Sequence, residues 1–170
     1  HVYVCGGSTG SQQCLNSVER LSLSSGAWLL CPRMQTSRAG AAACVVSGKL
    51  YVCGGCSERD SFPTNSVEWL DPARNEWTTG RSMLQARFCA SAAFVSGQLY
   101  VCGGESGERG ILNSVERFDP TYNRWEPMPS MSQRRAGSAA AVLGGKVCVC
   151  GGRDDRTPLR SVEYLHPKRE

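Results

Sequence analysis

The sequence predicts an all-β protein built from repeated four-stranded antiparallel sheets. Three observations support this fold class. A glycine pair closes a similar apolar run four times, starting at positions 6, 54, 103 and 151. The stretches between these pairs carry short strand signals in the same order, and no segment of useful length has helical periodicity. A strand-based repeat of about 50 residues is typical of propellers, in which sheets are arranged around an axis.

The first two strands of each unit are predicted to form a hairpin. The first strand is a run of small apolar residues, as at 41–46, and a glycine-containing turn at 47–49 follows it. The second strand, as at 50–53, ends at the glycine pair, where the backbone can turn sharply and approach a neighbour closely. We expect these glycines to be structural: Gly6, Gly7, Gly54, Gly55, Gly103, Gly104, Gly151 and Gly152.

The third strand carries Asn-Ser-Val-Glu, as at 65–68, and in the central units an Asp-Pro turn follows it. Its glutamate recurs in every unit, which indicates an architectural role: Glu19, Glu68, Glu116 and Glu163. The fourth strand carries a large aromatic residue that we expect to pack where adjacent sheets meet. These aromatic residues are Trp28, Trp77 and Trp125.

The co-repeating landmarks resemble the kelch repeat. They are Met-x-x-x-Arg, the apolar run, Gly-Lys-Leu-Tyr-Val-Cys-Gly-Gly, Asn-Ser-Val-Glu, Asp-Pro and Asn-x-x-Trp. In detail, Asn-Ser-Val-Glu-Arg-Phe-Asp-Pro at 113–120 is most similar to the kelch-like (BTB–BACK–kelch) family. The resemblance covers essentially all of residues 1–170. It implies a kelch β-propeller, commonly of six blades.

The repeat limits predict a segment of about 3.5 blades with 14 strands. We expect a partial blade at 1–30, blades at about 31–78 and 79–126, and a partial blade at 127–170. The chain starts with a second strand and ends with a third. We therefore expect part of a ring whose outer blades expose apolar sheet faces, so that further sequence or self-association is implied.

Composition argues against several classes of partner. The formal net charge of +4 is mild, and both signs are scattered without a basic run, which disfavours nucleic acid. No apolar run approaches the ~18 residues that a membrane helix needs. Four of the 10 cysteines hold the same strand position, where they would act as small buried apolar residues: Cys5, Cys53, Cys102 and Cys150. This usage favours a reducing, cytoplasmic location over a disulfide-bonded, secreted one.

The residues give little support for an enzyme or a metal site. Only His1 and His166 are available, so no catalytic Ser/His/Asp or Cys/His set can be assembled. The chain also lacks the histidines that a copper site like that of the kelch oxidases needs. Cys53 and Cys56 have Cys-x-x-Cys spacing, but structural zinc requires four such ligands. We predict no metal and no cofactor. Cys56, just past the glycine pair on an expected loop, is the candidate reactive thiol.

Recognition is predicted at the loops between the second and third strands. These loops share one end of the blades with the links to the next blade. They are the least repeated stretches, at 8–15, 56–64, 105–112 and 153–159. Variation over a repeated scaffold is where binding is expected. The candidates are charged residues of both signs, which suggests a mixed-charge partner: Glu58, Arg59, Asp60, Glu105, Glu108, Arg109, Arg153, Asp154, Asp155 and Arg156.

An arginine lies four residues after three of the methionines, at Arg38, Arg87 and Arg135, and Arg134 is a neighbour. One interpretation is structural, with the guanidinium bonded to backbone carbonyls of its own blade. The other is that the guanidiniums converge near the central channel, where each can contribute ~2 kcal/mol or more to binding. The family resemblance implies that arginines at this position can hold acidic peptide motifs, and we predict that these four contact the partner.

The sequence thus predicts a module that recognises a protein substrate or peptide motif. The family resemblance implies the substrate-binding kelch domain of a cullin-3 ubiquitin ligase adaptor, with the cullin contacted through a BTB domain outside these residues. An actin-binding cytoskeletal kelch protein is the alternative, and a kelch-fold enzyme is the third. Neither nucleic acid nor membrane is an expected partner.

Overall fold

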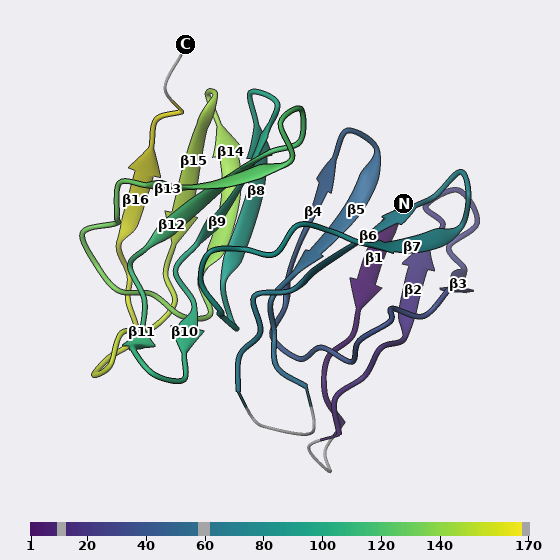
Figure 1. Cartoon of the computed structure of the whole chain (residues 1–170), viewed down its shortest axis with the longest axis horizontal. Helices are drawn as coiled ribbons and strands as arrows, with labels where there is room; N and C mark the ends of the chain where they lie inside the picture. Colours follow the sequence, from purple (N-terminus) through teal and green to yellow (C-terminus); the bar gives the residue numbers. More distant parts are fainter. Residues whose placement is uncertain (10–12, 58–61, 168–170) are drawn as a thin grey trace.

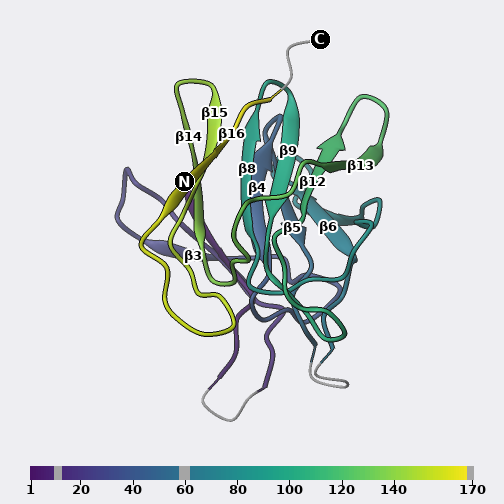
Figure 2. The same cartoon turned by 90° about the vertical axis from the view of Figure 1, so that its left-hand side faces the viewer.

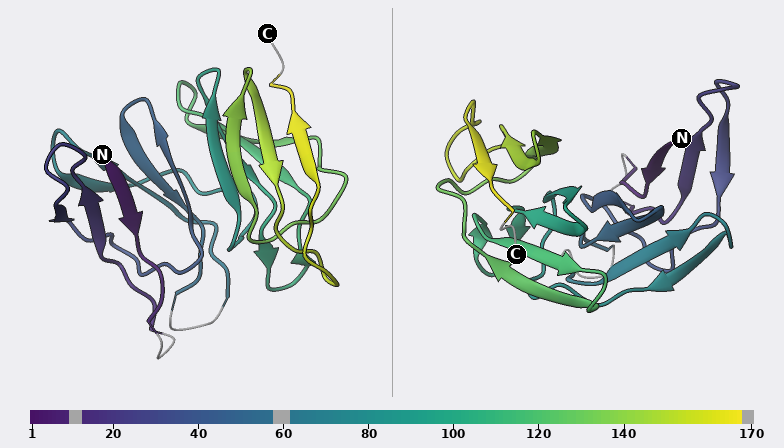
Figure 3. Two further views of the ribbon diagram at one scale, coloured as in Figure 1. Left: turned by 180° about the vertical axis from the view of Figure 1, so that it is seen from behind. Right: turned by 90° about the horizontal axis from the view of Figure 1, so that it is seen from above.

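The computed structural model describes residues 1–9, 13–57 and 62–167. The chain folds into antiparallel sheets arranged in an open arc, which is seen from above in the right panel of Figure 3. Four sheets of three, four, four and three strands form the blades, and one two-stranded hairpin is added to them. The predicted fold class is confirmed. None of the described residues belongs to a helix that could cross a membrane.

The blades follow one another along the chain (Figure 1). Blade 1 contains β1 (Val2–Cys5), β2 (Val18–Leu21) and β3 (Trp28–Cys31). Blade 2 contains β4 (Ala42–Val46), β5 (Lys49–Cys53), β6 (Val67–Asp71) and β7 (Glu76–Thr79). Blade 3 contains β8 (Ser91–Val95), β9 (Gln98–Cys102), β12 (Val115–Asp119) and β13 (Arg124–Met128). Blade 4 contains β14 (Ala139–Leu143), β15 (Lys146–Cys150) and β16 (Val162–Leu165).

We call the loop between the second and third strands of a blade its two-to-three loop. The small hairpin of β10 (Glu105–Ser106) and β11 (Gly110–Ile111) lies within this loop in blade 3. The repeat pattern does not predict it, because its sequence occurs in only one unit. The fourth strands β3, β7 and β13 end at Cys31, Thr79 and Met128, slightly beyond the expected blade limits at 30, 78 and 126.

Turn chemistry sets the strand register within each blade. In blade 3, Ser96 and Gly97 have φ values of 52° and 76°, which the tight turn between β8 and β9 requires. The resulting register places Ser91 opposite Cys102. In Figures 1 and 2 such first hairpins point upward, and the β10–β11 hairpin lies at the opposite end of the blade. The two ends of each blade therefore have separate loop sets.

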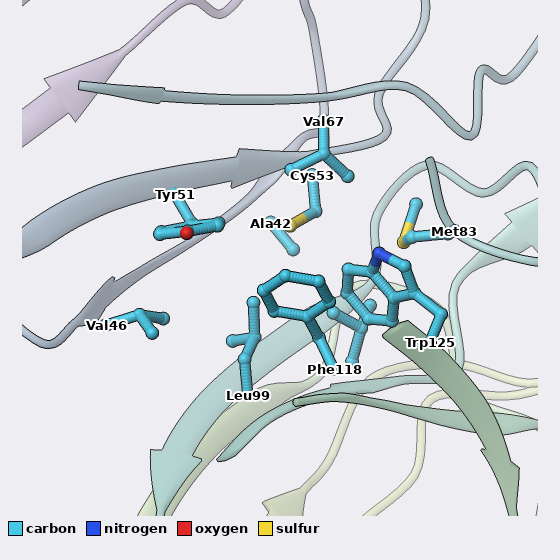
Figure 4. Close-up of a cluster of buried hydrophobic side chains, with 10 residues drawn as sticks. Ala42, Val46, Tyr51, Cys53, Val67, Met83, Leu99, Phe118 and Trp125 are labelled. Carbon is cyan, nitrogen blue, oxygen red and sulfur yellow. The ribbon is translucent and has the colours of Figure 1, made fainter. Parts of the chain in front are cut away.

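The core lies between blades rather than within them. Tyr51 of blade 2 faces Phe118 of blade 3 with ring centroids 5.8 Å apart, and Phe118 packs on Trp125 at 5.1 Å. Figure 4 shows these rings together with Met83 and Leu99 between the two sheets. Since both faces of a central blade are covered in this way, β5 and β9 are apolar without strict alternation.

The tryptophans pack as expected wherever a neighbouring blade is present. The indole N–H of Trp77 donates to the Pro32 carbonyl, and that of Trp125 donates to the Arg81 carbonyl, both at 2.8 Å. Trp28 belongs to blade 1 at the end of the arc, and 49% of its surface is exposed. The packing role therefore depends on a neighbour.

The two outer blades expose apolar surface, as the sequence predicts. Val2 and Val4 of β1 are half exposed, and Leu30 of β3 is 83% exposed. At the other end of the arc, Val162 and Tyr164 of β16 are also exposed. The left panel of Figure 3 shows the strands β1 and β16 at opposite ends of the molecule. The number of blades in a complete ring remains a prediction.

Candidate partner-binding face

Three links run from a methionine to an arginine between consecutive blades, at residues 34–38, 83–87 and 131–135. Each link is bound first to the blade that precedes it. The Met34 N–H donates to the Asn16 carbonyl at 2.9 Å, and the Arg38 N–H donates to the Leu15 carbonyl at 2.8 Å. The Asn16 amide donates back to the Met34 carbonyl at 3.1 Å. The asparagine of Asn-Ser-Val-Glu therefore holds the following link against the preceding blade through hydrogen bonds.

Each arginine binds the blade that it enters. Arg38 is 1% exposed. Its Nη1 donates to the carbonyls of Gly54 and Ser66 at 2.7 and 3.0 Å, which are the two roots of the loop between β5 and β6. Its Nε and Nη2 donate to Oε1 of Glu68 at 3.1 and 2.9 Å. All three guanidinium nitrogens are therefore bound within blade 2.

A similar arrangement recurs in blades 3 and 4, except that the Nε of Arg87 has no hydrogen-bond partner among the described residues. Arg87 bridges the Gly103 and Ser114 carbonyls and pairs with Glu116 at 2.7 Å. Arg135 bridges the Gly151 and Ser161 carbonyls and pairs with Glu163 at 3.0 Å. These arginines are 1% and 0% exposed.

These contacts correct the prediction that three arginines face a partner. Arg38, Arg87 and Arg135 are at most 1% exposed and are bonded to their own blades, so their guanidinium groups are not presented at the surface. The contacts fit the structural interpretation, in which each guanidinium is bonded to its own blade. Arg134 differs, since its side chain is 57% exposed and lies 3.6 Å from the Asp155 carboxylate.

Glu68, Glu116 and Glu163 have the architectural role that the sequence predicts for the repeated glutamates, whereas Glu19 is exposed. The Glu68 carboxylate accepts the backbone N–H groups of Gln35 and Thr36 at 2.6 and 3.2 Å, in addition to its bonds with Arg38. Glu116 and Glu163 hold the corresponding N–H groups of the next two links. Burial acts to raise the pKa of Glu163, but hydrogen bonds from Ser132 and Arg135 outweigh it and leave the pKa below its ordinary value.

The loop face carries those of the other charged candidates that the structure describes. Arg153 pairs with Glu105 of the neighbouring blade at 2.7 Å. Asp154 accepts the N–H groups of Arg156 and Thr157 at 2.8 and 2.7 Å, so it shapes its own loop. Glu58, Arg59 and Asp60 lie outside the described residues. Links and two-to-three loops do share one face, because isolated bridges join Ala39 to Cys56, Phe88 to Glu105 and Ala136 to Arg153.

A groove of about 610 Å³ opens on this face between the loops of blades 2 and 3. Its walls include Phe62 and Leu84, with Glu108 and Arg109 from the β10–β11 hairpin. Phe62 is 67% exposed and Leu84 is 59% exposed. A Cβ atom added to Gly107 would lie 3.1 Å from the Phe62 ring, so Phe62 reaches across to the hairpin. The groove therefore combines exposed apolar side chains with charges of both signs.

The sequence reasoning missed Phe62 and Leu84, although both depart from the repeat. Leu84 follows its methionine at the position that Gln35 and Ser132 hold in the other links. Phe62 is the only aromatic residue in the four two-to-three loops. An apolar residue at a position that is polar elsewhere in the repeat is the signal that could have found them.

The surroundings of Cys56 do not favour a reactive thiol. Cys56 is partly buried, and its thiol donates to the Ala39 carbonyl at 3.6 Å. Burial, followed by the neighbouring Cys14, raises the pKa of Cys56, which argues against the predicted reactive thiol. Burial raises the pKa of Cys53 and of Cys102 to about 12. In the part of the chain that the structure describes, no group of three or more His, Cys, Asp or Glu residues could hold a metal ion.

Comparison with known proteins agrees with this architecture. A family model described as the KLHDC2/KLHL20/DRC7 Kelch-repeats domain matches residues 1–152, which include all four glycine pairs. A search of curated proteins gave no match. Kelch-repeat propellers typically serve as protein-interaction modules and not as catalytic domains. Repeat, fold and family match together show that this chain belongs to the Kelch-repeat family.

Proposed function

We propose that this chain binds a protein substrate through the groove between the loops of blades 2 and 3, as the recognition module of a cullin-3 ubiquitin ligase adaptor. The observation that carries the proposal is the exposed apolar pair Phe62 and Leu84 in the walls of this groove. Large apolar side chains exposed beside charged residues are typical of protein-binding surfaces.

Burial of these two side chains supplies the affinity in this proposal. Covering a Phe or Leu side chain contributes ~1.5–3 kcal/mol, which is comparable to the effect of a binding hot spot. The groove has room for side chains from a partner, since its volume is about 610 Å³. We therefore expect the partner to insert apolar side chains next to Phe62 and Leu84.

The charged rim of the groove sets specificity. Glu108 and Arg109 are both exposed, and they offer opposite charges within one short hairpin. Complementary charges at an interface rim mainly steer association and exclude wrong partners. The proposed partner is therefore a peptide segment with an apolar centre and charges of both signs, and not the purely acidic motif that three converging arginines would suggest.

The adaptor assignment is supported by the resemblance of Asn-Ser-Val-Glu-Arg-Phe-Asp-Pro to the kelch-like family. Cytoplasmic location is part of the same proposal. All 10 cysteines are free thiols, including the buried Cys53 and Cys102, and this suits a reducing compartment.

The test is capture of partners from cell lysate with the complete protein, read by mass spectrometry. We expect the double variant Phe62→Ala/Leu84→Ala to lose a captured partner that Tyr122→Ala retains. Tyr122 is a suitable control because it is 76% exposed in the turn between β12 and β13. Equal capture by both variants would exclude the groove. Co-precipitation with cullin-3 supports the adaptor role, and co-sedimentation with F-actin without cullin-3 would replace it with the cytoskeletal alternative.

A further inference from the structure

The two-to-three loop of blade 4 carries a hydroxyl residue that is followed by a proline. Thr157-Pro158 is the only step in the sequence at which serine or threonine precedes proline. Thr157 and Pro158 are both exposed, and so is Arg160, the third residue after the threonine. The run Thr157-Pro158-Leu159-Arg160 is therefore presented on the surface.

The tip of this loop is held mainly by one side chain. Arg153 and Pro158 form an isolated antiparallel bridge, so residues 154–157 form the tip. The Asp154 carboxylate accepts the N–H groups of Arg156 and Thr157 at 2.8 and 2.7 Å. The Asp154 N–H donates to the Thr157 carbonyl at 3.1 Å. Because these bonds lie within the tip, breaking them leaves the sheet beneath unchanged.

The root of the loop has bonds of its own. The Ala136 N–H donates to the Arg153 carbonyl at 2.9 Å, and the Leu159 N–H donates to the Gly152 carbonyl at 2.8 Å. Neither bond involves the tip at 154–157. The tip can therefore open while the root stays paired.

The residues around Thr157 select one class of protein kinase. A proline directly after the acceptor lacks an N–H and restricts the acceptor toward the extended backbone in which kinases bind their substrates. The Arg160 guanidinium supplies a cation that acidic groups of such a kinase can bind. Asp154 lies three residues before Thr157, which disfavours kinases that require arginine there. No carboxylate occurs from Pro158 to Arg160, which disfavours kinases that require acidic residues after the acceptor.

We propose that Thr157 is a phosphorylation site for a proline-directed protein kinase that requires a basic residue three positions after the acceptor, and that the phosphate opens the loop tip at 154–157. The exposed Thr157-Pro158-Leu159-Arg160 run on a tip with its own local bonds carries this proposal. The site is separate from the groove between blades 2 and 3 and does not depend on the function proposed for that groove.

The transfer needs ATP with Mg²⁺, both supplied with the kinase. The Thr157 Oγ forms a bond to the γ-phosphorus of ATP while the bond from that phosphorus to the bridging oxygen of the leaving ADP breaks. The hydroxyl proton passes to a carboxylate base of the kinase. The product is phosphothreonine at position 157.

The phosphate acts on the tip through Asp154. Hydrogen bonds from the N–H groups of Thr157 and Arg156 hold the pKa of Asp154 below its ordinary value, so its carboxylate is ionised at neutral pH. A phosphothreonine carries a charge of about −1.5 to −2 and is repelled by a neighbouring carboxylate. We therefore expect the Asp154 carboxylate to release the two N–H groups of the tip.

The phosphorylation is tested on the full chain with Mg²⁺, ATP and an active cyclin-dependent kinase. Intact mass follows the reaction, and tandem mass spectrometry locates the phosphate. We expect modification at Thr157, none in Thr157→Ala, and an initial rate about tenfold lower in Arg160→Ala. Arg156→Ala is the matched control, since it removes the same charge from an exposed residue beside the acceptor, and we expect its rate to stay near that of the wild type.

A synthetic peptide of residues 150–163 separates the motif from its setting in the fold. Absence of phosphate on the folded chain would overturn the proposal, whether or not the peptide is modified. Modification of other residues alone, or equal rates for Arg160→Ala and the wild type, would overturn it as well.

Hydrogen exchange of the phosphorylated chain tests the opening of the tip. We expect the amides of Arg156 and Thr157 to exchange faster than in the unmodified chain, and the amide of Leu159 at the root to keep its rate. Unchanged exchange at Arg156 and Thr157 would show that the phosphate does not open the loop.

Discussion

At the scale of single residues, the buried arginines stabilise the blades and position the loops without touching a partner. Arg135 is 0% exposed and paired with Glu163, whereas the adjacent Arg134 is mostly exposed. Removing one member of a buried ion pair leaves an uncompensated group in the interior, which typically costs about 3–5 kcal/mol. Exposed ion pairs contribute only about 0–1 kcal/mol.

The neighbouring arginines therefore make a matched pair of variants. We expect Arg135→Ala to lower the free energy of unfolding by about 3 kcal/mol or more, and Arg134→Ala to change it by less than about 1 kcal/mol. Urea denaturation followed by tryptophan fluorescence measures both values. Similar losses of unfolding free energy in the two variants would show that the burial and pairing of Arg135 add little to stability.

Glu163 makes the stability depend on pH. Its pKa in the folded protein is lowered by hydrogen bonds from Ser132 and Arg135, despite the opposing effect of burial. A lowered pKa means that the ionised group stabilises the fold above the unfolded-state value of about 4.3, and that this contribution is lost as the pH falls through the folded-state pKa.

We expect the difference in urea midpoint between the wild-type protein and Glu163→Gln to be largest above about pH 5 and to shrink toward pH 3. Other carboxylates are shared by the two proteins, so their effects cancel in the comparison. A difference that stays constant over this range would contradict the role of the ionised carboxylate.

The thiols provide a second residue-scale test. Cys150 is exposed, whereas burial raises the pKa of Cys53 and of Cys102 to about 12. The thiolate is the reactive form, so a buried thiol with a raised pKa reacts slowly. We expect N-ethylmaleimide to label Cys150 in the folded protein and to label Cys53 and Cys102 only in urea, as mass spectrometry of the digest would show. Early labelling of Cys53 would indicate that blade 2 opens.

At the scale of elements, the glycine pair lies at the end of each second strand. In blades 2, 3 and 4 its backbone packs closely against the residues that lead into the first strand of the same blade. Gly55 has φ +91°, and an added Cβ would lie 2.9 Å from the Ala39 carbonyl oxygen. Gly7 holds the same repeat position with φ +105°, but no atom lies within 4 Å of its added Cβ, because no first strand pairs with β1.

Alanine substitution at these two positions separates backbone strain from steric overlap. We expect Gly7→Ala to cost about 1–2 kcal/mol for the left-handed backbone alone. We expect Gly55→Ala to cost about 1–3 kcal/mol more, because the Ala39 backbone must also move. Thermal unfolding of the two variants measures the difference, and equal costs would mean that the first strand adjusts freely.

The strands could be predicted from sequence because each has a local cause. Repeated apolar runs, turn glycines and the tryptophan position gave the blade strands, and β10–β11 was missed because it occurs once. The choice between the two roles of Arg38 was not local, since it depends on Glu68, which lies 30 residues away. The matched repetition of arginine and glutamate was the available signal for their pairing.

At the scale of the whole molecule, stability is unevenly distributed along the arc. In repeat structures each unit is stabilised mainly by its neighbours, so units with only one neighbour open more easily. All the residues from Leu99 to Cys102 in β9 are 0% exposed, whereas β1 alternates between exposed and half-buried positions.

Hydrogen exchange followed by mass spectrometry tests this gradient. We expect amides of β9 to be the most protected and those of β1 to exchange first, because β9 is bonded on both edges and β1 on one. Uniform protection of all blades would indicate a single cooperative unit. The open arc itself was predictable from the strand count, but the groove was not, because it needs Phe62 and Leu84 from separate segments to meet.

The guanidinium bridge between the two roots of each loop has a consequence for the diversification of specificity. The Arg87 guanidinium donates hydrogen bonds to the carbonyls of Gly103 and Ser114, and it makes no hydrogen bond to the residues between them. We therefore expect changes confined to the exposed tip at 107–109 to leave the sheet beneath intact, whereas Glu105 and Leu112 are held by backbone hydrogen bonds with Phe88 and Arg135. One scaffold can in this way carry interchangeable tips, each altered independently of its neighbours.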